Sequence, residues 1–268
     1  MDLDRIRGMF AAFALGDALG APHEFAQNWS NIYTGKLELQ GFRFNRFTQT
    51  KSVFDIGGIT DDSELTIALL STIQNKEYCV DRALLAYLDW ANSGCPHLGV
   101  NTRALFQGVK TKRGYTNRYN KVTQGEISQS NGSLMRCSPL ALVDNWRELT
   151  ALEVSAIKPQ GFGRAVILDC NLSNPNVINR DCSLVYVGWL RSLLKGKSVE
   201  HALCRVVDPC DEVYNVLEEE ERDISGKDKG WVLNRGRKAS SKQSAMQIVS
   251  VRSGVQVRHS RQHRSPSS

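Results

Sequence analysis

Residues 60–64, with the sequence Thr-Asp-Asp-Ser-Glu, place three carboxyl and two hydroxyl groups directly before an apolar run. Leu65, Leu69 and Ile73 follow at a spacing of four, which predicts a helix that is buried along one face. Thr60 is a typical N-cap residue, and carboxylates stabilise the positive end of a helix dipole. One interpretation is therefore that the acidic residues only start a helix.

The same cluster carries more negative charge than a helix start requires, because adjacent carboxylates repel each other. A hard divalent cation such as Mg²⁺ binds through carboxylate and hydroxyl oxygens and keeps several of its waters. Asp61 and Asp62 are therefore candidates for metal ligands as well as for helix-starting residues. The cluster alone does not decide between the two interpretations.

Helical periodicity recurs along the chain, whereas alternating strand patterns do not. Residues 26–59 lack a clear period and are predicted to be a long connection. Residues 100–128 are polar and contain three glycines, and no helix is predicted there. The sequence therefore predicts an all-α protein with one helical body and no βαβ units. Besides the helix that starts at Thr60, helices are predicted at residues 2–19, 80–92, 161–171, 181–195, 199–206 and 212–222.

Composition narrows the class of protein. The chain has 41% hydrophobic and 23% charged residues, which is ordinary for a soluble globular protein, and it has no apolar run long enough to span a membrane. Its seven cysteines are scattered without a Cys-x-x-Cys pair, and its N-terminus does not resemble a secretory signal. We expect an intracellular, cytoplasmic protein without a membrane partner.

The net charge of +6 belongs to the C-terminal part of the chain. Residues 231–268 contain eight Lys or Arg residues and no Asp or Glu, so the preceding residues hold 26 basic and 28 acidic side chains. The body therefore gives no electrostatic reason to expect nucleic-acid binding. Residues 235–268 are predicted to form a disordered basic tail, either solvated or in contact with a nucleic acid or membrane.

Five motifs in order resemble the ADP-ribosylglycohydrolase family, which includes the dinitrogenase-reductase-activating glycohydrolases and the ADP-ribosylhydrolases. Each motif is weak alone, but their common order makes the resemblance specific. It covers about residues 5–234, which are predicted to form one domain. The motifs are Gly-Asp-Ala-Leu-Gly-Ala-Pro-His-Glu-Phe at 16–25, Thr-Asp-Asp-Ser at 60–63, Ser-Asn-Gly-Ser-Leu-Met-Arg at 130–136, Leu-Ser-Asn-Pro-Asn at 172–176 and Gly-Lys-Asp-Lys-Gly-Trp-Val at 226–232.

The resemblance implies a compact all-helical fold with a binuclear Mg²⁺ centre at an ADP-ribose cleft. It implies hydrolysis of the bond between ADP-ribose and a protein side chain, with an ADP-ribosylated protein or ADP-ribose as the partner. Thr60, Asp61 and Asp62 match the first half of the metal site, and Asp62 is also taken as catalytic. Glu24 matches the acidic residue that works beside the reacting ribose.

The third motif implies the substrate-binding turn. Asn131, Gly132 and Ser133 match the family's loop that holds the diphosphate or ribose, and a turn rich in N–H groups suits an anion. Outside this family, the same residues would be an ordinary turn. Arg136, at the end of the motif, is predicted to be structural. His23 is not expected to be catalytic, because adjacent side chains such as His23 and Glu24 usually point apart.

Two departures from the family pattern qualify these expectations. The family closes its metal site with a late Gly-x-Asp-x-Asp-Thr segment, whereas this chain has no acidic residue after Asp228. We therefore expect an incomplete, truncated or frame-shifted C-terminal part that binds one ion or none. Asn174 stands where the family has histidine.

Three functions remain open on the sequence. The first is a Mg²⁺-dependent hydrolase of ADP-ribosyl–protein bonds. The second is a catalytically impaired relative that binds ADP-ribose or serves as a structural protein, as the family's lens crystallins do. The third is a helical interaction protein without ADP-ribose chemistry.

Overall fold

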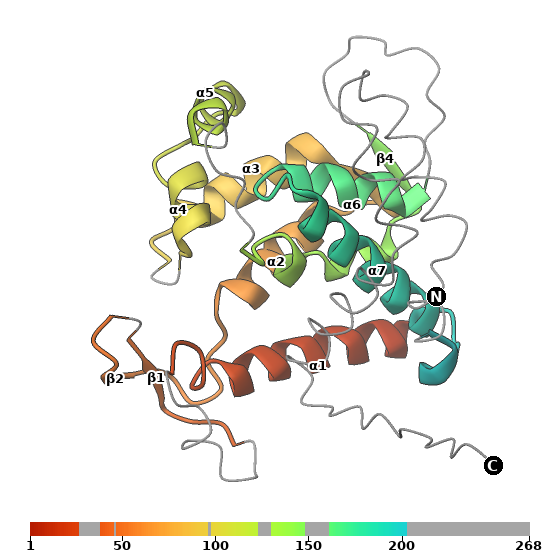
Figure 1. Ribbon diagram of the computed structural model, residues 1–268. Helices are drawn as coiled ribbons and strands as arrows, with labels where there is room; N and C mark the ends of the chain where they lie inside the picture. Colours follow the sequence, from red (N-terminus) through yellow and green to blue (C-terminus); the bar gives the residue numbers. More distant parts are fainter. Residues whose placement is uncertain (27–37, 46, 96–97, 123–129, 148–160, 203–268) are drawn as a thin grey trace, which may run out of the picture. The chain divides into compact units, whose positions relative to one another are not determined.

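The computed structural model describes residues 1–26, 38–45, 47–95, 98–122, 130–147 and 161–202 (Figure 1). Most of these residues are helical, which confirms the predicted all-α class. The helices are α1 (Leu3–Gly20), α2 (Asp61–Thr72), α3 (Val80–Ala91), α4 (Val100–Phe106), α5 (Lys112–Val122), α6 (Gly161–Asn171) and α7 (Val177–Leu194), with 3-10 turns η2 (Leu134–Arg136) and η3 (Ser138–Leu142).

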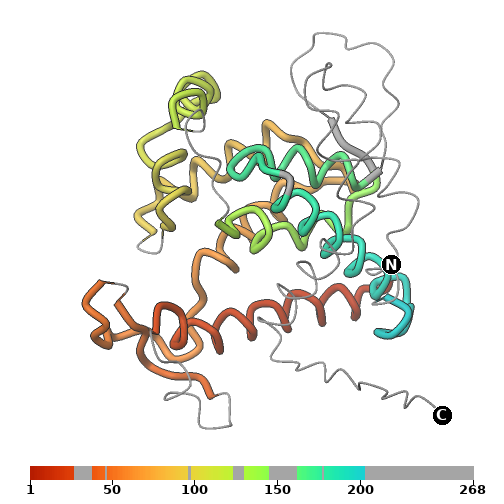
Figure 2. Tube along the Cα trace, in the orientation of Figure 1, coloured from red at the N-terminus to blue at the C-terminus, as the bar shows by residue number. Residues whose placement is uncertain are grey.

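Helix α2 packs against α3 and against both 3-10 turns. Leu65 and Leu69, which the sequence placed on the buried face of this helix, are fully buried, whereas Ile67 is 57% exposed. Helices α6 and α7 pack against each other and against η3, so residues 138–142 lie beside helices that come later in the chain (Figure 2). These contacts position α2, and with it the first turn of this helix, against α3 and the two 3-10 turns.

Helix α1 confirms the predicted helix at residues 2–19. Asp2 is its N-cap and accepts a hydrogen bond from the backbone N–H of Asp4. Leu3 is exposed, and Ala18 is the residue of this helix that is fully buried. Arg5 donates to the backbone carbonyl of Leu193 at 3.3 Å, so the start of α1 contacts the end of α7.

Some elements were not expected from the sequence. Helices α4 and α5 occupy the polar stretch 100–128, for which no helix was predicted, and α7 begins four residues earlier than predicted. Within the described ranges, four three-residue strands form two pairs: β1 (Phe42–Phe44) is antiparallel to β2 (Lys51–Val53), and β3 (Glu77–Cys79) is parallel to β4 (Asn145–Arg147).

All described residues belong to one compact unit within Met1–Val216. Of the helices predicted after residue 198, residues 199–202 are helical, and the remainder lies outside the described residues. The boundary at residue 234 and the basic tail lie there too and stay predictions. Among the described helices, none combines the length and apolar character needed to cross a membrane.

Candidate active site at the start of helix α2

The N-terminus of α2 is capped mainly from another helix. Thr60 is the N-cap, as predicted, and its hydroxyl accepts from the backbone N–H of Asp62 at 3.4 Å. Asp17 of α1 accepts three further hydrogen bonds, from the Thr60 hydroxyl at 2.6 Å, the Thr60 N–H at 2.9 Å and the Ser63 N–H at 3.2 Å. The Thr60 and Asp17 side chains therefore accept hydrogen bonds from the N–H groups at the start of α2, so this helix end does not require the carboxylates of both Asp61 and Asp62.

Those aspartates form a cluster of like charges with Glu24, which comes from the turn after α1. Asp61 is only 9% exposed. Burial, followed by the negative charges of Asp62 and Glu24, raises the pKa of the Asp61 carboxyl to about 7. The Asp61 backbone N–H and Arg43 act in the opposite direction without cancelling the rise. The structure thus brings together three of the carboxylates that the sequence proposed for the site.

Glu24 has a cationic partner that the sequence did not predict. Its carboxylate is 41% exposed and lies 2.7 Å from Nη2 of Arg43 on strand β1. The Arg43 guanidinium also lies over the rings of Phe25 and Phe54, at 5.7 and 5.6 Å from their centroids. Arg43 therefore holds the Glu24 carboxylate in place and places one positive charge beside the acidic cluster.

The predicted substrate turn lies between α5 and η2. Ser133 is almost fully buried, and its hydroxyl lies 3.4 Å from Sγ of Cys170, so this side chain faces the interior. A Cβ on Gly132 would lie 3.2 Å from Oδ1 of Asn174, which is a tight contact, so this position favours glycine. Within the described residues, the N–H groups of Gly132 and Ser133 donate no hydrogen bond. Two N–H groups remain for an anion.

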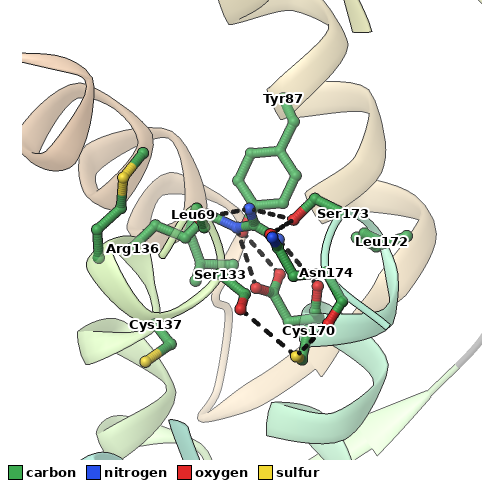
Figure 3. Close-up of polar contacts among 12 residues, drawn as sticks. Leu69, Tyr87, Ser133, Arg136, Cys137, Cys170, Leu172, Ser173 and Asn174 are labelled. Atoms are coloured by element: carbon green, nitrogen blue, oxygen red, sulfur yellow. Dashed lines mark hydrogen bonds and ion pairs between the residues drawn. The ribbon is translucent and has the colours of Figure 1, made fainter. Parts of the chain in front are cut away.

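Behind this turn lies a buried ion pair (Figure 3). Arg136 and Asp169 are both fully buried, and Nε of Arg136 donates to the Asp169 carboxylate at 3.1 Å. Its Nη1 donates to the Gly132 carbonyl at 2.7 Å and to the Ser173 hydroxyl at 2.8 Å. The Tyr87 hydroxyl donates to the other Asp169 oxygen at 2.7 Å. These contacts agree with the predicted structural role of Arg136.

The segment at 172–176 is tied to the same turn. Asn174, which replaces the family's histidine, is fully buried and donates to the carbonyl and hydroxyl of Ser130 at 2.9 and 3.1 Å. Its Oδ1 accepts from the Ser173 hydroxyl at 2.7 Å. From α5, the Tyr115 hydroxyl donates to the Leu172 carbonyl at 2.7 Å. Asn174 therefore stabilises the turn through its side-chain hydrogen bonds to Ser130.

Helix α4 lies between the acidic cluster and the turn. A Cβ on Gly99 would lie 3.8 Å from Oδ2 of Asp61 and 3.9 Å from Oγ1 of Thr102. A Cβ on Gly132 would also lie 3.9 Å from the same Thr102 oxygen. The first turn of α4 thus links the acidic cluster with the substrate turn, and the two predicted parts of the site are neighbours.

Four residues of this region were not singled out from the sequence. Asp17 had a signal, because it is part of the Gly-Asp-x-x-Gly motif, but its contact with Thr60 spans 43 positions. Arg43 lies in a stretch without a period and Thr102 in a helix that was not predicted, and Asp169 lies in the helix predicted at residues 161–171. No local pattern indicated that these side chains converge.

The residues present fit a metal centre in part. Hard oxygen donors are the ligands that Mg²⁺ prefers, and a cation would relieve the repulsion around Asp61. However, within the described ranges no group of three or more His, Cys, Asp or Glu side chains could hold a metal ion. The predicted first half, with Thr60, Asp61 and Asp62, is assembled as an acidic cluster without a complete coordination set. The segment after Asp228 lies outside the described residues.

These observations define a helical protein with a carboxylate cluster beside a turn of free N–H groups. The sequence matches the family model of the ADP-ribosylglycohydrolases over residues 1–255, and the chain therefore belongs to the ADP-ribosylglycohydrolase family. A comparison with curated proteins found no match. The family match extends 21 residues past residue 234, the predicted end of the resemblance. Membership indicates a glycohydrolase that acts on ADP-ribosylated substrates.

Proposed function

We propose that this protein hydrolyses the glycosidic bond between ADP-ribose and a protein side chain in a Mg²⁺-dependent reaction. The observation that carries the proposal is the excess of carboxylate at the start of α2. Asp17 supplies the helix cap, so Asp61 and Asp62 are left with a repulsion that a ligand could relieve. Buried repulsion of this kind is typical of functional sites.

The reaction breaks the bond from ribose C1 to the side-chain atom of the modified residue. Water adds to C1, and the leaving side chain takes up a proton, through a transition state with oxocarbenium character. Glu24 is 41% exposed, so its carboxylate can reach a water molecule and accept its proton. Arg43 orients this carboxylate through their ion pair.

Thr60, Asp61 and Asp62 would hold Mg²⁺ through their oxygen atoms. When bound, the ion would orient ribose hydroxyls and make a coordinated water more acidic. The N–H groups of Gly132 and Ser133 would receive the diphosphate.

A second function has its own support. Glu24 is paired with Arg43 in a short ion pair, and the described carboxylates do not form a complete metal-binding group. Both features favour a relative that binds ADP-ribose without turnover, or that has a structural role. This alternative predicts binding at the same turn but no hydrolysis.

The test combines calorimetry with a hydrolysis assay. ADP-ribose is titrated into the full chain with Mg²⁺ or EDTA, and release of ADP-ribose is measured from ADP-ribosylated arginine and serine peptides. We expect turnover that EDTA abolishes and that Asp62→Ala or Glu24→Ala lowers by about 100-fold or more. Asp89→Asn, which removes an exposed charge on α3, is the matched control.

Each outcome separates the alternatives. Turnover that survives EDTA would exclude the metal-dependent reaction. Binding without turnover would support the second function, and the absence of both would exclude any ADP-ribose chemistry. Full activity of Glu24→Ala would show that another group accepts the proton.

A further inference from the structure

A second acidic feature lies on α2, separate from the cluster around Asp61. An open pocket of about 500 Å³ is formed by the first half of α2 and by the end of α3 with the turn that follows it. Glu64, Ile67 and Ala68 line it from α2, and Trp90 and Cys95 line it from the other side. The lining contains no Lys or Arg, so the pocket has the negative charge of one carboxylate and an otherwise neutral wall.

Among the described residues, the donors that hold the Glu64 carboxylate are neutral. Its Oε2 accepts from Nε1 of Trp90 at 2.8 Å and from Sγ of Cys95 at 2.9 Å. Within the described part of the chain, Oε1 accepts no hydrogen bond and Glu64 has no ion pair. The side chain is therefore fixed in direction, with one oxygen and one negative charge left without a partner.

The apolar part of the pocket is also open to a ligand. Ile67 is 57% exposed, although it lies only two residues from each of the fully buried Leu65 and Leu69 of the same helix. A ligand that paired with Glu64 would therefore place any methylene groups against Ile67 and Ala68. Long basic side chains combine these two properties, since they bury an alkyl stem and present a cation at its end.

We propose that this pocket binds an alkyl guanidinium or alkyl ammonium group, which in proteins is the end of an arginine or lysine side chain. The cation would donate a charge-assisted hydrogen bond to Oε1 of Glu64, and its stem would cover Ile67. Glu64 comes two residues after Asp62 on the same helix. If the proposed hydrolysis holds, the pocket would recognise a basic residue close to the modified one in the substrate protein.

The direct test uses small probes and does not depend on hydrolysis. n-Butylguanidinium chloride and n-butylammonium chloride are titrated into the ¹⁵N-labelled full chain, and the indole N–H signal of Trp90 is followed by NMR. A Trp90→Phe variant assigns this signal among the five tryptophans. We expect saturable shifts with dissociation constants in the millimolar range, about what a ligand of this size can reach. The tighter probe distinguishes an arginine from a lysine site.

Two controls make the test decisive. Neutral n-butylurea has a similar shape without the charge and is expected to leave the signal unchanged. Glu64→Gln is expected to weaken binding of the cations at least 10-fold, whereas Asp89→Asn, which removes an exposed charge from α3, leaves it unchanged. Equal shifts with butylurea, or equal affinity in Glu64→Gln, would overturn the proposal. The butylurea comparison needs only the unmodified chain, so it stands even if the variant folds poorly.

Discussion

Two groups of charged side chains near the turn at Gly132 differ in how their charge is balanced. Arg136 and Asp169 are fully buried, and opposite charges meet at 3.1 Å. At the start of α2, Asp61 is nearly as deeply buried, but its closest charged neighbours include two carboxylates. The opposite charges of the first group balance each other, whereas in the second group Arg43 balances only part of the negative charge.

The contrast shows why burial alone does not mark a functional residue. Both centres remove charge from water, which is costly unless a partner compensates it. Around Asp169 the compensation comes from a guanidinium and a tyrosine hydroxyl of the chain itself. At the start of α2, Asp17 accepts hydrogen bonds from the helix end, and burial followed by the negative charges of Asp62 and Glu24 raises the pKa of Asp61. Four changes test this comparison.

The largest effect is expected from breaking the buried pair. Asp169→Asn leaves the Arg136 guanidinium buried without its countercharge, and we expect the free energy of unfolding to fall by about 3–5 kcal/mol. Urea denaturation measures the loss. Asp144→Asn, at the exposed end of the Arg191–Asp144 pair, is the matched control and is expected to cost less than about 1 kcal/mol. Similar losses in both variants would contradict the distinction drawn here.

The second largest effect is expected in the pH dependence of the unfolding free energy of the metal-free protein. The pKa of Asp61 is raised from 3.8 to about 7, so the folded state holds a proton that the unfolded state has lost between these values. The contribution of protonated Asp61 to the stability of the folded state is fully present below pH 3.8 and is lost as pH rises towards 7. A pKa difference of one unit corresponds to about 1.4 kcal/mol, so Asp61 can change the free energy of unfolding by at most roughly 4 kcal/mol over this pH range. We expect a change of about half that size.

The measurement is the difference in unfolding free energy between wild type and Asp61→Asn in EDTA from pH 4 to pH 8. Asp61→Asn removes the titrating group and is expected to become the more stable protein at pH 8. A difference between the two proteins that does not change with pH would show that Asp61 has an ordinary pKa.

A divalent cation should reverse part of this loss. At pH 8 we expect 10 mM Mg²⁺ to raise the free energy of unfolding of the wild type by about 1 kcal/mol, because an ion bound only to the folded state stabilises it. Asp62→Asn is expected to lose this gain, and Ca²⁺ and NaCl at matched ionic strength serve as controls. An equal gain in wild type and Asp62→Asn would mean that the ion acts elsewhere or only by screening.

Much of this arrangement was predictable from local sequence patterns. Thr60 was predicted as the N-cap, and Leu65 and Leu69 as the buried face of α2, since both signals repeat within a few residues. Helix α5 was missed because it has no periodic apolar face: Tyr115 is its one buried residue among those described. The three-residue strands are too short to carry an alternating pattern, and β3 and β4 pair segments that are distant in the sequence.

The site was predictable in its motifs but not in its partners. The motifs supplied Glu24, Asp61, Asp62 and the turn at Gly132, and the fold places them near one another. Arg43 was unpredictable, because a single cation in an irregular stretch gives no indication of which carboxylate it meets. Whether the residues after Asp228 complete the metal site is a question about a segment outside the described residues.

The smallest effect is expected from Arg43. Its ion pair with Glu24 is partly exposed, so Arg43→Gln should change the free energy of unfolding by less than about 1 kcal/mol. Arg43 also lowers the pKa of Asp61, so its loss should raise that pKa further and move the pH-dependent loss of stability to higher pH. Carboxyl ¹³C shifts of Asp61 in EDTA measure this, with Arg118→Gln on α5 as the control. If Arg43→Gln left the Asp61 titration unchanged, the guanidinium would be serving Glu24 alone, and the acidic cluster would depend still more on an added cation for its balance.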